Sequence, residues 1–196
     1  MRAMTLYEVR EAVHGRWLAR GGVQTVQGVT TDTRSAGAGQ LFFALAGRRT
    51  DGHEYLSQAA EAGCVAAIVA ADANLPPETL AAFGAGVIAV ADTTAALGDL
   101  AARHRKLVSA PAVIGVTGSN GKTTVKRMIH HILSRRLRGT CSPKSFNNNI
   151  GLPLTLLGVS PGDDYVICEI GTNAPGEIAA LSRMARPHLA VITSIG

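Results

Sequence analysis

A glycine-rich loop between an apolar run and a basic helix constrains this 196-residue chain more than any other feature. Residues 112–117 (Ala-Val-Ile-Gly-Val-Thr) are apolar and β-branched, which predicts a buried strand. Gly118 and Gly121 follow, and residues 122–137 have helical spacing. A strand that turns through glycines directly into a helix is typical of α/β folds. We therefore expect an α/β fold with a mainly parallel sheet.

The same loop has the composition of a phosphate-binding site. Its glycines let backbone N–H groups turn toward an anion, and the helix N-terminus adds positive potential. Lys122 offers a charge to terminal phosphates, and the Thr123 hydroxyl is a ligand type that Mg²⁺ accepts. Val116 occupies the first glycine position of the long G-x-x-x-x-G-K-[ST] pattern, so the loop fits the shorter G-x-x-G-K-T form. The predicted nucleotide contacts are Gly118, Ser119, Asn120, Gly121, Lys122, Thr123 and Thr124.

Two further motifs carry polar groups toward this loop. Glu169 ends a second buried run, residues 164–169, and open α/β sheets bind ligands at the carboxyl ends of their strands. There it can hold a nucleotide's Mg²⁺; the alternative is an edge glutamate in solvent. The run Asn147, Asn148 and Asn149 precedes Ile-Gly-x-Pro. Its amides suit a carbonyl or phosphate, but asparagine also forms turns, so a plain loop is the alternative.

The pattern of elements divides the chain into two blocks, residues 1–109 and 110–196. Ser109-Ala110-Pro111 is the best candidate boundary. With 46% hydrophobic and only 4% aromatic residues, the cores must use Ala, Val, Leu and Ile, which suits helices packed on a parallel sheet. The predicted helices are residues 5–14, 53–62, 92–108, 122–137 and 176–185. The predicted strands are residues 64–70, 86–91, 112–117, 164–169 and 188–193, with shorter strands in 21–45.

Composition excludes several classes of protein. No run of 18 apolar residues is present and the first 15 residues carry charges, so neither membrane insertion nor a signal peptide is expected. The three cysteines are scattered without a C-x-x-C, which favours a reduced, cytoplasmic setting over a disulfide framework or zinc ribbon.

The net charge of +5 suits a protein that binds small phosphorylated anions. The basic stretch 122–138 is interpreted as the solvated face of one helix. A protein that acts on nucleic acid is the competing interpretation, but the chain lacks aromatic platforms and a named motif for it.

Four motifs, taken together, resemble the Mur ligase family. They are GVTGSNGKTT, SFNNNIGLPLTLL, CEIGTNAPGEIAAL and PHLAVITSIG, in this order and spacing. Within that family, the asparagine run followed by Ile-Gly-x-Pro is similar to the branch that adds D-alanyl-D-alanine to UDP-N-acetylmuramoyl-tripeptide. The first block agrees through residues 31–34 (Thr-Asp-Thr-Arg), 39–45 and 51–53 (Asp-Gly-His).

The resemblance implies a small N-terminal α/β UDP-binding domain, followed by the first half of a P-loop ATPase domain. It implies an ATP-dependent, amide-forming ligase of cytoplasmic peptidoglycan precursor synthesis that works through an acyl phosphate. Lys122 and Glu169 would be catalytic, and Thr123 and Glu169 would hold Mg²⁺. The substrate would contact Thr31, Asp32, Thr33, Arg34, Asn147 and Asn148. The cofactors are ATP and Mg²⁺, and the full-length protein would be a monomer.

The resemblance also places further parts beyond Gly196: a metal-site histidine, a carbamylated lysine and a closing domain. The chain is therefore expected to be a fragment that does not catalyse the ligation, with an open apolar edge at its last strand. An alternative is a catalytically inactive module that binds a UDP-sugar or nucleotide.

Overall fold

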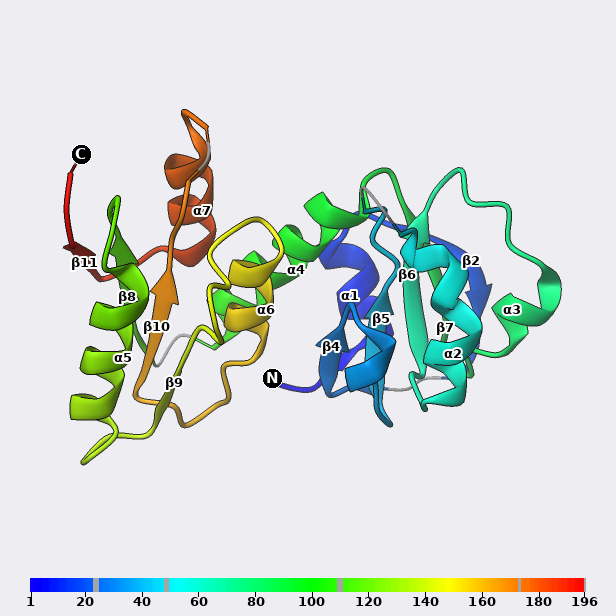
Figure 1. Ribbon diagram of the computed structural model, residues 1–196. Coiled ribbons are helices and arrows are strands. Elements are labelled where there is room, and N and C mark those ends of the chain that lie inside the picture. The colour runs from blue at the N-terminus through cyan, green and yellow to red at the C-terminus, as the bar shows by residue number, and fades with distance from the viewer. Residues whose placement is uncertain (23–24, 48–49, 109–110, 173, 196) are drawn as a thin grey trace. The chain divides into compact units, whose positions relative to one another are not determined.

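The computed structural model describes residues 1–22, 25–47, 50–108, 111–172 and 174–195 (Figure 1). They form two compact units. The N-terminal unit is Ala3–Leu100, and the C-terminal unit is Ala101–Gly196 together with Met1–Arg2. The domain boundary predicted at residues 109 and 110 lies outside the described residues. No helix in the described ranges has the length and apolarity needed to cross a membrane.

The N-terminal unit is built on a sheet with strand order β2-β7-β6-β5-β4. Its strands are parallel except β2, which pairs antiparallel with β7. The strands are β2 (Arg16–Arg20), β4 (Gly28–Thr30), β5 (Gln40–Phe43), β6 (Ala66–Ala70) and β7 (Gly86–Val90). A separate antiparallel pair joins β1 (Met4–Thr5) and β3 (Thr25–Val26). The helices are α1 (Leu6–Ala12), α2 (Leu56–Glu61), α3 (Pro77–Ala81) and the first part, as far as Leu100, of α4 (Thr93–Leu107), with 3₁₀ turns η1 (Thr33–Ser35) and η2 (Gly52–Tyr55).

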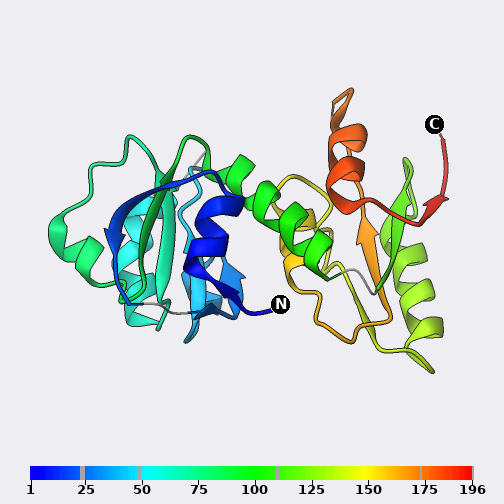
Figure 2. The same ribbon diagram turned by 180° about the vertical axis from the view of Figure 1, so that it is seen from behind.

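Alternating apolar side chains bury both faces of this sheet. Phe42, Ala67 and Val69 pack in one cluster with Leu56 and Ala59 of α2. The residues between them along the strands, such as Phe43 and Ile68, point to the other face and are fully buried as well. Helix α2 lies in front of the sheet in Figure 1. Helix α1 lies in front of the sheet in Figure 2, which is the view from the opposite side. Near-continuous apolar strands are what a sheet covered on both faces requires.

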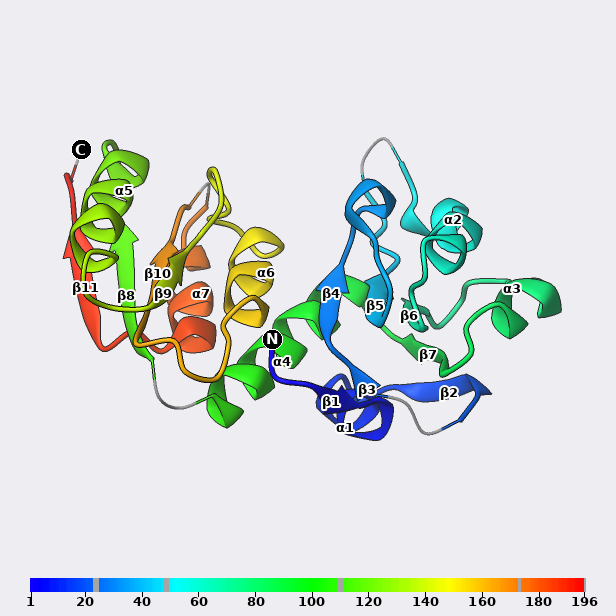
Figure 3. The same ribbon diagram turned by 90° about the horizontal axis from the view of Figure 1, so that it is seen from below.

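The C-terminal unit has a wholly parallel sheet in the order β11-β8-β10-β9. The strands are β8 (Ala112–Thr117), β9 (Gly139–Cys141), β10 (Tyr165–Glu169) and β11 (Leu189–Ile192), and the helices are α5 (Lys122–Leu133), α6 (Gly151–Leu157) and α7 (Glu177–Ala185). Figure 3 shows α5 and α7 on opposite sides of this sheet. Helix α5 packs against the sheet through Val125, Ile129 and Leu133. These side chains pack against the cluster that contains Val116 and Ile167.

Local capping explains where two helices begin. Thr5 is the N-cap of α1: its hydroxyl accepts the N–H of Glu8, and the Glu8 carboxylate accepts the N–H of Thr5. Asp92 accepts the N–H groups of Thr94 and Ala95 at the start of α4. The helix predicted to begin at residue 92 is therefore confirmed, with Asp92 as its N-cap.

The predicted α/β fold is confirmed, and the differences lie in short elements. The basic helix ends at Leu133 instead of residue 137. Strands β2 and β9 and helices α3 and α6 were not predicted, because segments of three to seven residues carry too little periodicity. Strand β11 lies at the sheet edge with Leu189 and Ile192 exposed, which confirms the predicted open apolar edge.

Candidate functional site

The glycine-rich loop joins β8 to α5 as the sequence predicts. Gly118 and Gly121 have φ angles of +135° and +80°, a region that glycine adopts freely and other residues avoid. A Cβ on Gly118 would also lie 2.3 Å from Thr193 Oγ1. Helix α5 begins directly after Gly121 with no side-chain cap. The N–H groups of its first turn are therefore placed to bind an anion.

Lys122 is the first residue of α5, and its side chain folds back over the loop. Its ammonium donates to the backbone oxygens of Gly118 (2.6 Å) and Ser119 (3.2 Å). The N–H groups of Ser119 and Asn120 donate to the backbone oxygen and the hydroxyl of Ser194, each at 3.0 Å. The first turn of α5 therefore offers N–H groups to a phosphate, whereas these two loop amides already have partners.

Glu169 lies at the end of β10 and faces the start of α5. The Thr123 hydroxyl donates to Glu169 Oε2 at 2.9 Å, which confirms the predicted juxtaposition of these two residues. The Asn147 amide donates to Glu169 Oε1 at 3.1 Å. Glu169 is only 1% exposed, so the alternative of an edge glutamate in solvent is wrong.

Lys126, one turn further along α5, completes this cluster. Its ammonium lies 2.9 Å from Glu169 Oε2, and both side chains are almost fully buried. The interpretation of the basic stretch as a solvated face is therefore wrong for this lysine. Its neighbour Arg127 is exposed, in agreement with that interpretation.

Hydrogen bonds keep the Glu169 carboxylate charged despite its burial. Desolvation alone would raise the pKa of Glu169. The hydrogen bonds from Lys126, Thr123 and Asn147 outweigh it and lower that pKa below its ordinary value. A charged carboxylate beside a hydroxyl is the oxygen donor set that Mg²⁺ prefers.

This donor set fits Mg²⁺ only together with further ligands. Within the described ranges, no group of three or more His, Cys, Asp or Glu side chains could hold a metal ion. Mg²⁺ is commonly bound by one or two carboxylates, with substrate phosphates and water completing its coordination. Thr123 and Glu169 therefore suit a metal ion that arrives with a nucleotide.

The asparagine run has a structural use as well. The Asn148 side-chain oxygen accepts the N–H groups of Ile150 (3.1 Å) and Gly151 (2.9 Å), where α6 begins. Asn147 turns toward Glu169 instead, and its backbone oxygen accepts the N–H of Gly171 at 2.8 Å. The run therefore lies in the turn before α6, as the loop alternative expects, and Asn147 in addition supports the carboxylate. Contact of Asn147 and Asn148 with a substrate stays a prediction.

A second candidate site lies in the N-terminal unit. A cavity of about 650 Å³ opens there, within the size range of small-molecule sites. Of the six residues predicted to bind substrate, the four in this unit, residues 31–34, line it, and Asn147 and Asn148 do not. The full lining is Thr31, Asp32, Thr33, Arg34, Phe42, Leu45, Thr50, Gly52, Tyr55 and Gln58.

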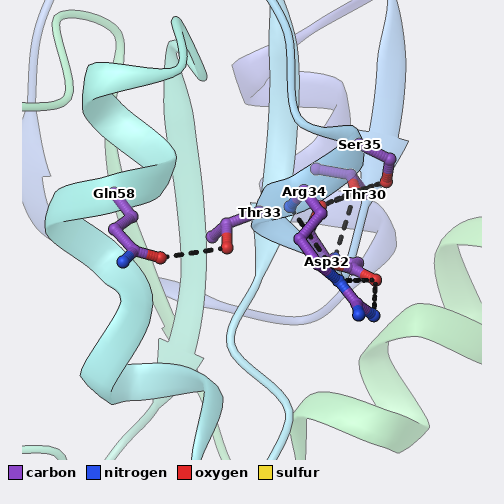
Figure 4. Close-up of polar contacts among 6 residues, drawn as sticks. All are labelled: Thr30, Asp32, Thr33, Arg34, Ser35 and Gln58. Atoms are coloured by element: carbon purple, nitrogen blue, oxygen red, sulfur yellow. Dashed lines mark hydrogen bonds and ion pairs between the residues drawn. The ribbon is translucent and has the colours of Figure 1, made fainter.

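Asp32 and Arg34 bond to each other in this cavity, and Thr33 bonds to Gln58 (Figure 4). Arg34 donates to both oxygens of Asp32, through Nε at 2.9 and 3.1 Å and through Nη2 at 2.6 Å. These side-chain bonds, followed by the bond from the Arg34 backbone N–H, lower the pKa of Asp32 to about 2. The Thr33 hydroxyl donates to Gln58 Oε1 at 3.1 Å. Arg34 thus pairs with a structural carboxylate here while its side chain stays 87% exposed.

Asp51 and His53 fix the turn that carries Gly52 into the same cavity. Nε2 of His53 accepts the N–H of Ala70 at 2.9 Å, so a neutral ring carries its proton on Nδ1, which lies 2.6 Å from Asp51 Oδ1. The backbone N–H of His53 and then its ring lower the pKa of Asp51. Asp51 and His53 therefore fix the conformation of the turn in which Gly52 lines the cavity.

Sequence models of known families match both units. "Mur ligase family, catalytic domain" matches residues 25–105, and "Mur ligase middle domain" matches residues 116–196. Together they span most of the chain. The chain belongs to the Mur ligase family.

Curated relatives narrow the comparison within the Mur ligases. The UDP-N-acetylmuramoyl-tripeptide–D-alanyl-D-alanine ligase of Bacillus subtilis (strain 168) is 45% identical over 193 residues, which cover 98% of this chain and 41% of the relative. The enzyme of that name from Escherichia coli (strain K12) is 38% identical over 197 residues, covering 100% of this chain and 41% of the relative. The chain thus spans about two fifths of the length of these curated relatives.

Solved structures agree with the observed fold. A crystal structure of MurF from Acinetobacter baumannii superposes with a TM-score of 0.87 at 34% identity, covering 100% of this chain and 42% of that one. The MurF ligase of Thermotoga maritima, solved in complex with ADP, gives 0.73 at 27% identity, covering 87% of this chain and 38% of that one.

One site residue, Lys126, was not predicted from the sequence, although the sequence contains a signal for it. Lys126 lies three residues before Ile129 and seven before Leu133, on the apolar stripe of the helix. A lysine on a buried stripe needs a carboxylate or carbonyl partner. Glu169, at the end of the neighbouring strand, was the available candidate.

Proposed function

We propose that this chain is part of an ATP-dependent ligase that joins D-alanyl-D-alanine to UDP-N-acetylmuramoyl-tripeptide. The observation that carries the proposal is the contact between Thr123 and Glu169 beside the glycine-rich loop. It brings a hydroxyl and a charged carboxylate to the N-terminus of α5, where a phosphate would bind. The identity of the substrates is inferred from the names of the curated relatives.

The proposed reaction has two steps. The terminal phosphoryl group of ATP passes to the tripeptide carboxylate, giving an acyl phosphate and ADP. The amine of D-alanyl-D-alanine then attacks the acyl carbon, phosphate leaves, and the amine loses a proton. A free carboxylate is a poor acyl donor, and the phosphoryl group turns one of its oxygens into a leaving group.

The residues of the C-terminal unit would act by binding and by charge. Thr123 and Glu169 would hold Mg²⁺, and Lys122 would exchange its two carbonyl partners for phosphate oxygens. Gly118, Ser119, Asn120, Gly121 and Thr124 would shape the loop around the phosphates. Asn147 would keep Glu169 oriented, and Asn148 would present its amide nitrogen on the substrate side.

The cavity of the N-terminal unit would take the UDP end of the substrate. Arg34 is exposed and already in the planar geometry that binds two oxygens, so its guanidinium could bind a diphosphate while it keeps contact with Asp32. Thr31 and Thr33 add hydroxyls at the same wall. The proposed setting is the cytoplasm, whose reducing conditions keep cysteines such as Cys64, Cys141 and Cys168 free.

Phosphate release by the protein made from the complete gene tests this function. Release should require ATP, Mg²⁺, the UDP-linked tripeptide and D-alanyl-D-alanine together. Lys122→Ala should lower kcat by at least about 100-fold, because it removes a charge that acts on the transferring phosphoryl group. Arg127→Ala, an exposed change on the same helix, is the matched control and should keep full activity.

Calorimetry separates the alternatives. A protein that binds ADP and the UDP-linked tripeptide but never releases phosphate would be a binding module instead of a ligase. Release that proceeds without D-alanyl-D-alanine would contradict the proposed acceptor.

A further inference from the structure

Lys126 donates to three oxygens from two other segments of the C-terminal unit. It bonds to Glu169 Oε2 at the end of β10 (2.9 Å) and to the backbone oxygen of Ser142 (2.9 Å). Its third partner is the backbone oxygen of Lys144. An ammonium has three N–H groups, so this set uses its whole donor capacity. Lys126 itself belongs to α5 and is 1% exposed.

The segment from Ser142 to Asn147 meets Glu169 through further bonds. The Ser142 hydroxyl accepts the backbone N–H of Glu169 at 3.1 Å. The amide of Asn147 donates to the Glu169 carboxylate, and its backbone oxygen accepts the N–H of Gly171. Lys144 adopts a left-handed φ of +45°, which is uncommon for a residue with a side chain. The Lys126 ammonium donates to the backbone oxygen of Lys144, so it holds the segment at the residue with the left-handed conformation.

We propose that Lys126 is a positioning residue whose ammonium holds Glu169 and residues 142–147 in the arrangement that receives Mg²⁺ and nucleotide. The proposal rests on the proposed function for the identity of that ligand. It does not make Lys126 a catalytic residue, because Lys126 contacts only protein atoms. Oxygens of Glu169, Ser142 and Lys144 surround the ammonium as oxygen ligands surround a metal cation. We therefore expect the charge of Lys126, and not only its volume, to hold this arrangement.

Amide hydrogen exchange of the 196-residue chain tests the positioning role without any ligand. In Lys126→Ala, the N–H groups of Phe146, Glu169 and Gly171 should exchange at least about ten times faster, because the bonds that hold this segment are lost. Arg127→Ala changes an exposed cation one residue away and should leave those rates unchanged. Equal rates in wild type and Lys126→Ala, or equal acceleration in Arg127→Ala, would overturn the proposal.

Chemical rescue distinguishes charge from packing. Propylammonium replaces the side-chain atoms that the alanine variant lacks, and 1-propanol has the same size without the charge. Propylammonium chloride should slow the exchange of these three amides again, whereas 1-propanol and potassium chloride should not. Rescue by 1-propanol to the same extent would show that Lys126 only fills space, and the proposal would fail.

A second variant covers the case in which Lys126→Ala does not fold. Lys126→Met with Glu169→Gln removes both charges and leaves no unpaired buried ion. Phe146 should still exchange faster in this double variant, because the bonds to the Ser142 and Lys144 carbonyls are gone. An unchanged Phe146 rate would overturn the proposal. Titration of the wild type with Mg²⁺ and ADP is a separate readout: absence of binding would contradict the proposed function and leave the exchange result standing.

Discussion

The two units each pair a carboxylate with a cation, and the two pairs differ in burial far more than in distance. Arg34 and Asp32 lie 2.6 Å apart with side chains 87% and 42% exposed. Lys126 and Glu169 lie 2.9 Å apart with side chains 1% and 2% exposed. Water can replace either partner of the first pair, whereas the side chains of the second pair are almost completely shielded from solvent.

This difference in burial indicates that the two ion pairs have different roles. An exposed ion pair contributes little to stability, so Arg34 can change partners at small cost when an anion enters the cavity. A buried pair that loses one member leaves a charge without solvent, so Lys126 and Glu169 must stay together. The exposed pair suits an anion that binds and leaves, and the buried pair suits a fixed support for the proposed metal site.

The largest expected effect is on the buried pair. Lys126→Met should lower the free energy of unfolding by about 3–5 kcal/mol, because Glu169 is left charged and unpaired. Urea unfolding followed by circular dichroism measures this loss. Arg127→Met, an exposed change on the same helix, should stay within about 0.5 kcal/mol of the wild type. A loss below about 1 kcal/mol for Lys126→Met would place the buried pair in the same class as an exposed one.

A pH titration of stability should reveal a buried group that must stay neutral. His104 is fully buried, and its Nε2 accepts the N–H of Arg2 while Nδ1 lies 3.1 Å from the backbone oxygen of Leu156. Desolvation, followed by the nearby N-terminal charge, lowers the pKa of His104 from 6.5 to about 4.

The sign of the pH effect follows from that pKa. The unfolded chain takes up the proton first as the pH falls, so stability is full above pH 6.5 and declines toward pH 4. The loss attributable to His104 is about 3 kcal/mol, since each pKa unit corresponds to about 1.4 kcal/mol. The variant His104→Gln should unfold with a flatter pH profile in this range. The same slope in the variant and the wild type would exclude His104 as the cause.

The smallest expected stability effect is at the exposed pair. Arg34→Ala should change the free energy of unfolding by less than about 1 kcal/mol. Trp17, the single tryptophan, lies in the N-terminal unit and reports this transition by fluorescence. The same variant should weaken binding of the UDP-linked tripeptide at least about tenfold, if the guanidinium binds the diphosphate. Unchanged affinity would assign Arg34 to the structure of the cavity alone.

Sequence patterns predicted the parts of the fold that repeat a strong period or a strict motif. Residues 112–117 form the predicted strand, and the glycine loop and the position of Glu169 opposite Thr123 follow from the ends of parallel strands. Lys126 was not predicted because charge runs are usually solvated, and only the apolar stripe beside it argues otherwise. The Asp32–Arg34 pair was not predicted, because sequence spacing does not decide whether Arg34 binds a ligand or an internal carboxylate. Strand β9, with three residues, has no period to read.

We propose above all that the cluster of Lys122, Thr123 and Glu169 binds a magnesium nucleotide. Calorimetric titration of the chain with ADP, in Mg²⁺ and in EDTA, tests it most directly. We predict that binding is at least about tenfold tighter in Mg²⁺ for the wild type, because Thr123 and Glu169 bind the metal that the phosphates carry. Thr123→Val should abolish that difference. Equal affinity in Mg²⁺ and EDTA for the wild type, or no binding in either, would contradict the claim.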